Sequence, residues 1–155
     1  MGLYGGFVRR YSGTRWFAWV AARTAPRLDL LVHRMSHGRR LATPNEVPTL
    51  LLTTHGRRSG EPRTVPLSFA TMDDALFVVG TNFGQAHQPA WALNLLHRPE
   101  AVAEYRGERW EVRASRVPED ARGDLWSAFD AIVPAYRNYR SRVDRPIHMF
   151  RLERV

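Results

Sequence analysis

The sequence predicts a mainly β protein with helices, an α+β domain in which six short strands form a closed or partly split antiparallel barrel. Six runs of β-favouring residues follow Thr49, short turns join several of them as hairpins, and helical segments stand between and around them. The 155 residues suit one domain. We expect an N-terminal helical segment and linker over residues 1–48 and the barrel over residues 49–155.

The N-terminal segment is predicted to be helical over Tyr11–Ser36, with a break at Pro26. The prediction follows from apolar side chains that recur at helical spacing: Leu28, Leu31, Val32 and Met35. After this segment, Gly38–Pro48 has the glycine, proline and asparagine content of a connecting loop.

A hairpin and a third strand are expected to open the barrel. Thr49–Thr54 and Arg63–Ala70 are β-favouring runs, and the polar segment His55–Pro62 joins them as a turn. The Asp73-Asp74 turn then leads to Ala75–Val79, which is apolar enough to be a buried strand.

A short helix over Pro89–His97 is expected to precede a second hairpin. Ala101–Arg106 and Arg109–Val117 flank Gly107-Glu108 as the two strands of this hairpin. In the second strand, apolar residues alternate with charged ones, as a half-buried strand requires: Trp110, Val112 and Ala114.

One further helix and a last strand complete the prediction. The helix should open at Pro118, because the two acidic residues that follow suit the positive end of a helix dipole. Pro134 ends it, a tyrosine-rich segment continues to Asp144, and Ile147–Glu153 is the last strand. The apolar stripe of this helix is Leu125, Ala128, Phe129 and Ile132.

The charge of the chain points to an anionic partner. All 23 basic residues are arginine, and the formal net charge is +8. Codon bias in the genome explains part of this composition. The other part is physical, because a guanidinium group holds a phosphate at two points.

Composition also removes several kinds of chemistry. The chain has no cysteine, which excludes disulfides, thiolate nucleophiles and cysteine-based zinc sites. No apolar run is long enough for a membrane span, and we expect a cytoplasmic protein. The histidines show no metal-ligand spacing, so we expect no metal site: His33, His37, His55, His87, His97 and His148.

The segment Thr53–Gly60, followed by Arg63, combines the groups that an anion cradle needs. Two glycines permit a tight backbone turn, Ser59 offers a hydroxyl, and three arginines offer charge-assisted donors. The glycine spacing is not that of a Walker-type loop, and no lysine is present. By composition alone, a solvated basic hairpin tip remains the alternative.

The order of residues from Thr53 to Leu67, T-T-x-G-R-R-S-G-x-x-R-x-x-P-L, resembles the signature of the deazaflavin-dependent nitroreductase family of actinobacteria. Further similarities follow in the same order along the chain: Gly84, Pro89-Ala90-Trp91, Asn94-Leu95, Pro134-Ala135-Tyr136, Tyr139 and Asp144-Arg145. The likeness extends over about Thr49 to Leu152.

The resemblance implies a split β-barrel related to flavin-mononucleotide-binding barrels, which holds coenzyme F-420, a deazaflavin with a phosphate and an acidic tail. By matching positions, the basic hairpin would hold the phosphate and tail: Thr54, Gly56, Arg57, Arg58, Ser59, Gly60 and Arg63. The ring system would lie beside Val65, Pro66, Val79, Gly80, Thr81, Asn82, Ala90, Trp91 and Asn94.

Four positions depart from the family pattern. His55 stands where relatives have a third threonine, and Arg58 stands where many have lysine, and both suit phosphate. Asn82 and Val133 stand where some relatives carry lysine and tyrosine. The last two changes leave the acceptor open among a quinone, an enone or other unsaturated compound, and a nitro compound.

The implied reaction is hydride transfer from the reduced coenzyme, which requires positioning and exclusion of water from the protein. A proton must also reach the acceptor, and the candidate donors are Tyr136, Tyr139, Thr81 or bound water, with Tyr136 first. The alternative for both tyrosines is that their rings pack a wall of the substrate site. For Trp91 the alternative to coenzyme contact is a role as a core residue.

The sequence also suits other functions. A flavin-mononucleotide (FMN)-dependent reductase and a non-catalytic carrier of an anionic cofactor both suit the same barrel. A nucleic-acid partner is not expected, because the arginines are spread over nearly every element. Trp16, Phe17 and Trp19 among N-terminal arginines suit peripheral membrane contact, a packing role over the barrel, or a homodimer interface.

Overall fold

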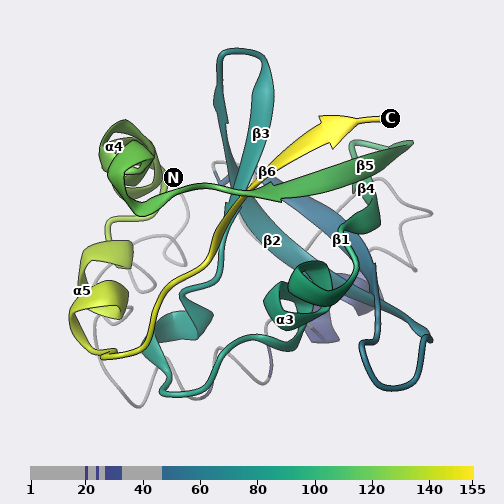
Figure 1. The fold of residues 1–155 in the computed structure, drawn as a ribbon, viewed down its shortest axis with the longest axis horizontal. Coiled ribbons are helices and arrows are strands. Elements are labelled where there is room, and N and C mark those ends of the chain that lie inside the picture. The colour runs from purple at the N-terminus through teal and green to yellow at the C-terminus, as the bar shows by residue number, and fades with distance from the viewer. Residues whose placement is uncertain (1–19, 21–23, 25–26, 33–46) are drawn as a thin grey trace.

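The strands pair in the order β1-β2-β3-β6-β5-β4, and pairing between β1 and β4 closes the barrel (Figure 1). The computed structural model describes residues 20, 24, 27–32 and 47–155. The strands are β1 Thr49–His55, β2 Pro62–Met72, β3 Ala75–Val79, β4 Glu100–Tyr105, β5 Glu108–Arg116 and β6 Met149–Arg154. All neighbouring strands are antiparallel. The prediction of a six-stranded antiparallel barrel is confirmed.

Helices fill the long connections between strands. They are η1 Asn82–Gly84, α3 Ala90–His97, η2 Glu119–Ala121, α4 Gly123–Ile132 and α5 Tyr136–Ser141. Residues 27–32 are also helical, and within them Leu28 and Leu31 are exposed while Asp29 is buried. The remainder of the predicted N-terminal helix, the aromatic group around Trp16 and most of the predicted loop before Pro48 lie outside the described residues.

Two tight turns join strands at one end of the barrel. Asp73 and Asp74 have φ of 49° and 59°, and Arg106 and Gly107 have φ of 52° and 82°. Two successive left-handed residues are typical of the two-residue turns that match the twist of a hairpin. The second turn lies one residue earlier than predicted, because Glu108 already pairs with Tyr105.

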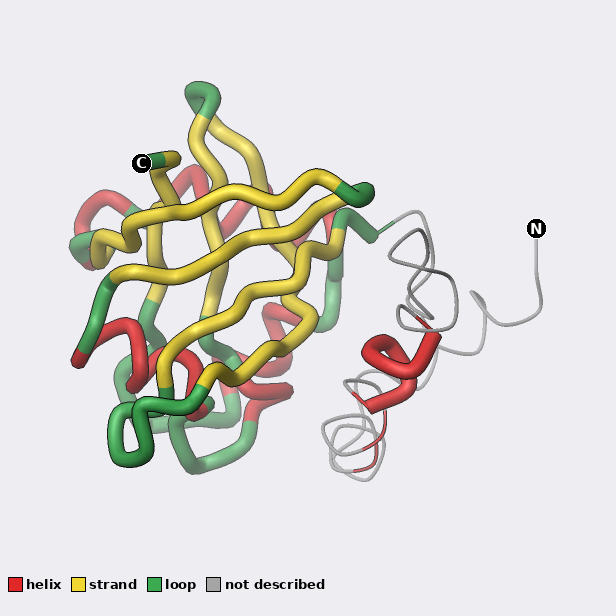
Figure 2. Tube along the Cα trace, turned by 90° about the vertical axis from the view of Figure 1, so that its right-hand side faces the viewer, coloured by secondary structure: helices red, strands yellow, loops and turns green. Residues whose placement is uncertain are grey.

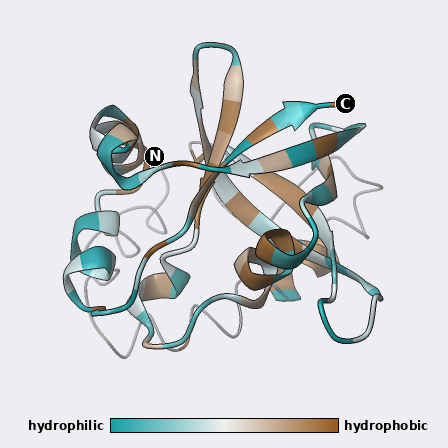
Figure 3. Ribbon diagram, in the orientation of Figure 1, coloured by the Kyte–Doolittle hydropathy of each residue, from teal (hydrophilic) through white to brown (hydrophobic). Residues whose placement is uncertain are grey.

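Two hydrophobic clusters hold the fold together. The first fills the barrel, where Leu50, Leu52 and Val78 are fully buried, and Trp91 and Leu95 of α3 close its end. The second lies outside the barrel wall, where Phe129 of α4 and both tyrosines of α5 pack over Ala70 and Phe77. Figure 3 shows the contrast between the hydrophobic strands and α3 and the hydrophilic surface of α5.

The helix expected to open at Pro118 begins later than predicted. Residues Glu119–Ala121 form a separate 3-10 turn, and α4 begins at Gly123. Between them the buried Arg122 side chain donates hydrogen bonds to the Val117 and Ile147 carbonyls, which fixes the chain at the junction. The predicted apolar stripe is confirmed, since Leu125 and Phe129 are buried and the others pack beside them.

Candidate functional site

Every long connection leaves the same end of the barrel, opposite to the two tight turns. The β1–β2 loop, the segment between β3 and β4, and the segment between β5 and β6 all begin there, because all neighbouring strands are antiparallel. Figures 1 and 2 show the β2–β3 hairpin projecting from the other end, away from these connections. The predicted site residues in these connections therefore lie at one end of the barrel, while Val65 and Pro66 lie within β2.

Asn94 fastens the basic loop after β1 to helix α3. Its side-chain nitrogen donates a hydrogen bond to the Thr54 hydroxyl at 3.0 Å, and its side-chain oxygen accepts one from the Arg57 backbone N–H at 3.0 Å. Both Asn94 and Thr54 are buried. A buried amide with both ends paired fixes its neighbours, so Asn94 sets where the loop leaves the barrel.

The loop over residues 56–61 is closed by its own backbone. The Gly56 N–H donates to the Glu61 carbonyl at 2.8 Å, and the Gly60 N–H donates to the Gly56 carbonyl at 2.7 Å. Gly60 has φ of +72°, and a Cβ atom on Gly56 would lie 2.7 Å from the Ser59 hydroxyl oxygen. These two N–H groups therefore close the loop, and the tight turn expected of the two glycines is present.

The outer side of this loop carries donors without partners. The Arg57, Arg58 and Arg63 side chains are exposed and make no hydrogen bond or ion pair with any described residue. The backbone N–H groups of Arg58 and Ser59 likewise donate to no group in the described part of the chain. Such a concentration of unpaired donors suits phosphate and carboxylate groups.

Arg145 holds the segment that follows β3. Its guanidinium group donates to the carbonyls of Gly80 at 3.2 Å, Thr81 at 2.9 Å and Gln85 at 3.1 Å. It also donates to the Gln88 side chain at 2.9 Å and to the Pro146 carbonyl at 3.3 Å. Burial lowers the pKa of Arg145 from its ordinary value.

The same segment contains three successive left-handed residues and contacts α5. Asn82, Phe83 and Gly84 have φ of 48°, 55° and 74°, and Asn82 donates to the His87 carbonyl at 3.1 Å. A Cβ atom on Gly84 would lie 3.1 Å from the Tyr139 backbone, so this close approach requires glycine. The Phe83 ring lies edge-on to the Tyr139 ring at 5.8 Å.

The two tyrosines of α5 are buried. Burial raises the pKa of Tyr136 to about 12, against a hydrogen bond with Ser68 of β2 that lowers it. Burial also raises the pKa of Tyr139. The rings lie edge-on at 5.9 Å, and Tyr136 also contacts the Phe129 ring at 5.5 Å. Both hydroxyls therefore keep their protons at neutral pH.

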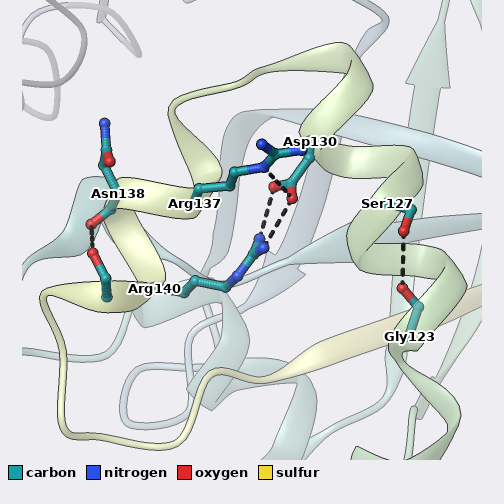
Figure 4. A network of polar contacts seen from close by, with 7 residues as sticks. Gly123, Ser127, Asp130, Arg137, Asn138 and Arg140 are labelled. Atoms are coloured by element: carbon teal, nitrogen blue, oxygen red, sulfur yellow. Dashed lines mark hydrogen bonds and ion pairs between the residues drawn. The ribbon is translucent and has the colours of Figure 1, made fainter.

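An ion pair joins helix α5 to helix α4. The Asp130 carboxylate accepts hydrogen bonds from Arg140 at 2.7 and 2.8 Å and from Arg137 at 3.0 Å (Figure 4). Arg140 also lies over the Trp126 ring, with its central carbon 4.6 Å from the ring centroid. The Arg140 hydrogen bond, with help from Arg137, holds the pKa of Asp130 below its ordinary value.

The remaining predicted residues divide between surface and core. Ala90 is exposed at the start of α3, and Pro66 and Val65 are half-buried on β2. Val79, Gly80 and Thr81 are buried. Trp91 is a core residue, 7% exposed and edge-on to Phe150 at 5.9 Å.

The structure brings the predicted residues together in two groups. Thr54, the basic loop and Asn94 form one, and the segment after β3 with the α5 tyrosines forms the other. Within the described residues, no hydrogen bond, ion pair or ring contact connects the basic loop with the tyrosines. Both groups lie at the same barrel end.

Sequence reasoning gave no role to three residues that support these groups. Ser68 lowers the pKa of Tyr136, Asp130 fixes α5, and Arg145 fixes the segment after β3. Arg145 belongs to the pattern of family similarity, but its role has no signal in the sequence, because a side chain that binds backbone carbonyls has no characteristic partner there. An aspartate inside an otherwise apolar helix face was a usable signal for Asp130.

His148 is a further buried group near this segment. Its carbonyl accepts a hydrogen bond from the Gly80 N–H at 2.8 Å, and its ring Nδ1 has no partner among the described residues. Burial lowers its pKa, as do the neighbouring charges of Arg116, Arg122 and Arg145. No group of three or more metal-binding side chains occurs in the described part of the chain. No helix there is long and apolar enough to cross a membrane.

Comparison with known proteins identifies the family. A family model described as F420H(2)-dependent quinone reductase matches residues 26–154. An F420H(2)-dependent quinone reductase of Mycobacterium tuberculosis is 32% identical over 147 residues, which cover 91% of this chain and 97% of that protein.

Solved structures share the fold. An F420-H2 dependent reductase, FDR-A, superposes with a TM-score of 0.62 and 26% identity, covering 68% of this chain and 94% of that one. A protein solved as a domain-swapped dimer superposes with a TM-score of 0.65 and 23% identity, covering 80% of this chain and 95% of that one. The resemblance to deazaflavin-dependent reductases is confirmed, and the chain belongs to the F420H(2)-dependent quinone reductase family, oxidoreductases whose cofactor is coenzyme F-420.

Proposed function

We propose that this protein catalyses the reduction of a quinone by reduced coenzyme F-420. The observation that supports the proposal best is the basic loop at the end of the barrel. Its three arginines are exposed and unpaired among the described residues, and Asn94 fastens the loop to α3. A fixed loop with free guanidinium groups suits a ligand with a phosphate and an acidic tail.

The donor set of this loop fits the coenzyme. Arg57, Arg58 and Arg63 would hold the phosphate and the acidic tail, together with the unpaired N–H groups of Arg58 and Ser59. Gly56 and Gly60 close the loop that presents them. Thr54 and Asn94 are buried and paired with each other, so their role would be to position the loop.

The ring system would lie against the segment after β3 and the start of α3. Val79, Gly80, Thr81 and Asn82 would line one side, with Ala90 and Trp91 on α3 and Val65 and Pro66 on β2 completing the set. That segment is held in place by the hydrogen bond from Arg145 to the Thr81 carbonyl and by the close contact of Gly84 with the Tyr139 backbone.

When bound, the reduced coenzyme supplies a hydride to the acceptor. Tyr136 is the proposed proton donor, because burial raises its pKa to about 12 and the hydroxyl stays protonated at neutral pH. Ser68 of β2 faces that hydroxyl and acts against the rise in its pKa. Tyr139 and Thr81 are the next candidates, and Tyr139 also packs against the segment that carries Thr81.

A quinone is the acceptor that the family supports. Enone and nitro compounds remain proposals, and they belong to the same reaction class because each accepts a hydride and a proton. Val133 follows α4 directly and packs in the second hydrophobic cluster beside α5, where a planar apolar acceptor would meet it.

Titration of the purified protein with coenzyme F-420, followed by tryptophan fluorescence, tests the coenzyme site. We expect tight binding of F-420 and weaker binding of flavin mononucleotide, which lacks the acidic tail. An Arg57→Ala/Arg63→Ala double variant should bind F-420 about 10- to 100-fold more weakly, because it loses two charge-assisted contacts.

The matched control is Arg106→Ala/Arg109→Ala. This variant removes the same charge from exposed arginines at the β4–β5 turn, at the other end of the barrel. Its affinity should stay within about twofold of the wild type at moderate salt. Equal losses in both double variants would show a general charge effect and would remove the basic loop as the binding site.

The proposed reaction with a small-molecule acceptor requires no macromolecular partner. Formation of a homodimer and peripheral contact with a membrane are two further proposals, each with its own test. The domain-swapped dimer among the solved structures motivates a test of dimerisation by light scattering. Sedimentation with anionic vesicles tests membrane contact through the N-terminal segment, whose aromatic group lies outside the described residues.

A further inference from the structure

Arg145 makes more hydrogen bonds to the segment after β3 than any other described side chain. It donates to the carbonyls of Gly80 and Thr81 at 3.2 and 2.9 Å and to the Gln85 carbonyl at 3.1 Å. The Gln88 side chain accepts a fourth bond at 2.9 Å and donates to the Pro146 carbonyl at 2.6 Å. Arg145 is therefore tied to both ends of this segment.

These bonds fix the direction of two successive peptide groups. Thr81 has φ of −70° and ψ of −26°, so the carbonyls of Gly80 and Thr81 point to the same side, where Arg145 binds both. In a trans peptide the N–H points opposite to the C=O. The N–H groups of Thr81 and Asn82 are thereby turned away from Arg145.

The segment has hydrogen bonds of its own, from the Gly84 N–H to the Thr81 carbonyl and from the Asn82 side chain to the His87 carbonyl, but its backbone is strained. Asn82 and Phe83 have φ of 48° and 55°, which non-glycine residues seldom adopt. A phenylalanine in the left-handed region persists only where surrounding contacts determine it. Arg145 supplies such contacts through its hydrogen bonds to the Thr81 and Gln85 carbonyls. The Tyr139 backbone supplies another, because it lies close against Gly84.

We propose that Arg145 is a positioning residue for the coenzyme, which it serves by holding Gly80 and Thr81 in the orientation that receives the ring system. This inference rests on the proposed function. Arg145 uses its five donor contacts on the protein itself, so it acts through the segment after β3 and needs no contact with the coenzyme.

Arg122 provides a matched control. It is buried where Arg145 is half-buried, and it also binds backbone carbonyls, with bonds to Val117 at 3.1 and 2.8 Å and to Ile147 at 2.8 Å. None of its hydrogen bonds reaches the segment from Gly80 to Gln88. If a variant changed coenzyme binding only by destabilising the fold, substitutions of Arg145 and of Arg122 should therefore weaken that binding equally.

The experiment compares Arg145→Lys with Arg122→Lys in the full chain. For each variant we would measure the melting temperature, the affinity for F-420 and the steady-state constants with reduced F-420 and a naphthoquinone. Both variants should lose stability. Only Arg145→Lys should bind F-420 about tenfold more weakly or worse and lose about 10- to 100-fold in kcat/KM for the coenzyme, with the quinone KM little changed.

The outcomes separate the two proposals. Equal affinity for F-420 in both lysine variants, with comparable melting temperatures, would overturn the role of Arg145 and leave the proposed function intact. Wild-type protein that does not bind F-420 would overturn the proposed function itself. Arg145→Gln and Arg122→Gln extend the comparison to loss of charge, and the lysine pair decides the result where a glutamine variant does not fold.

Discussion

Tyr136 is the residue on which the proposed chemistry depends most. It lies 8% exposed in the second hydrophobic cluster, edge-on to Phe129 and Tyr139, and Ser68 acts against the rise in its pKa. Burial disfavours the phenolate, so the hydroxyl can donate a proton only as the acceptor gains negative charge. The sequence indicated this tyrosine through family similarity, and it could not indicate Ser68, whose partner is far away in the chain.

Tyr136→Phe removes the hydroxyl and keeps the ring. We expect kcat for quinone reduction to fall by about 10²-fold or more, because general acid catalysis contributes at least that much. Tyr105→Phe is the control, since Tyr105 packs against Phe69 near the opposite end of the barrel. A Tyr136→Phe enzyme as fast as the wild type would assign the proton to Tyr139, Thr81 or water.

The pH dependence of stability provides a second test with the Tyr136→Phe variant. A raised pKa means that the unfolded chain ionises first, from an ordinary value of 10.0, while folded Tyr136 ionises at about 12. The stability due to neutral Tyr136 is therefore complete below about pH 10 and is lost as the pH rises through about 12. Alkaline unfolding curves of wild type and Tyr136→Phe should diverge in this range alone.

At the scale of elements, local sequence predicted strands better than helix boundaries. The turn at Asp73-Asp74 and the alternation from Trp110 to Ala114 are short-range signals, and both are present in the structure. The start of α4 depends on the distant Ile147 carbonyl, which binds Arg122. Contacts of this range leave no periodic signal in the sequence, so the Pro118 prediction was wrong.

The ion pair between α4 and α5 gives a test at this scale. Asp130→Asn removes the charge that Arg140 and Arg137 share and should lower the free energy of unfolding by about 1–3 kcal/mol near neutral pH. The Arg137 share is small, since that side chain is 74% exposed and screened by solvent. Urea unfolding of both proteins measures the difference.

The stabilisation by Asp130 should depend on pH in the acid range. The pKa of Asp130 is depressed in the folded state, so its stabilisation is present above the ordinary value of 3.8 and is lost as the pH falls through the folded value. The difference between wild type and Asp130→Asn should therefore shrink in strong acid. Asp120→Asn, on the exposed turn before α4, is the control, and an undiminished difference in acid would contradict the role of the ion pair.

At the scale of the whole molecule, the barrel separates an end with two short turns from an end that carries the candidate site. Both two-residue turns lie at one end, and the basic loop, the segment held by Arg145 and the α5 tyrosines lie at the other. The number of strands was predictable from the sequence. The β1–β4 and β3–β6 pairings were not, because they join residues about 50 to 75 positions apart and depend on closure of the whole sheet.

The most direct measurement is the oxidation of reduced coenzyme F-420 by a naphthoquinone in the presence of the purified protein, followed by the absorbance of the oxidised coenzyme. We expect turnover that depends on both protein and quinone, a raised coenzyme KM in Arg57→Ala/Arg63→Ala, and little turnover with reduced flavin mononucleotide. Absence of turnover with F-420, or equal turnover with the flavin, would contradict a quinone reductase that uses the basic loop to select the deazaflavin.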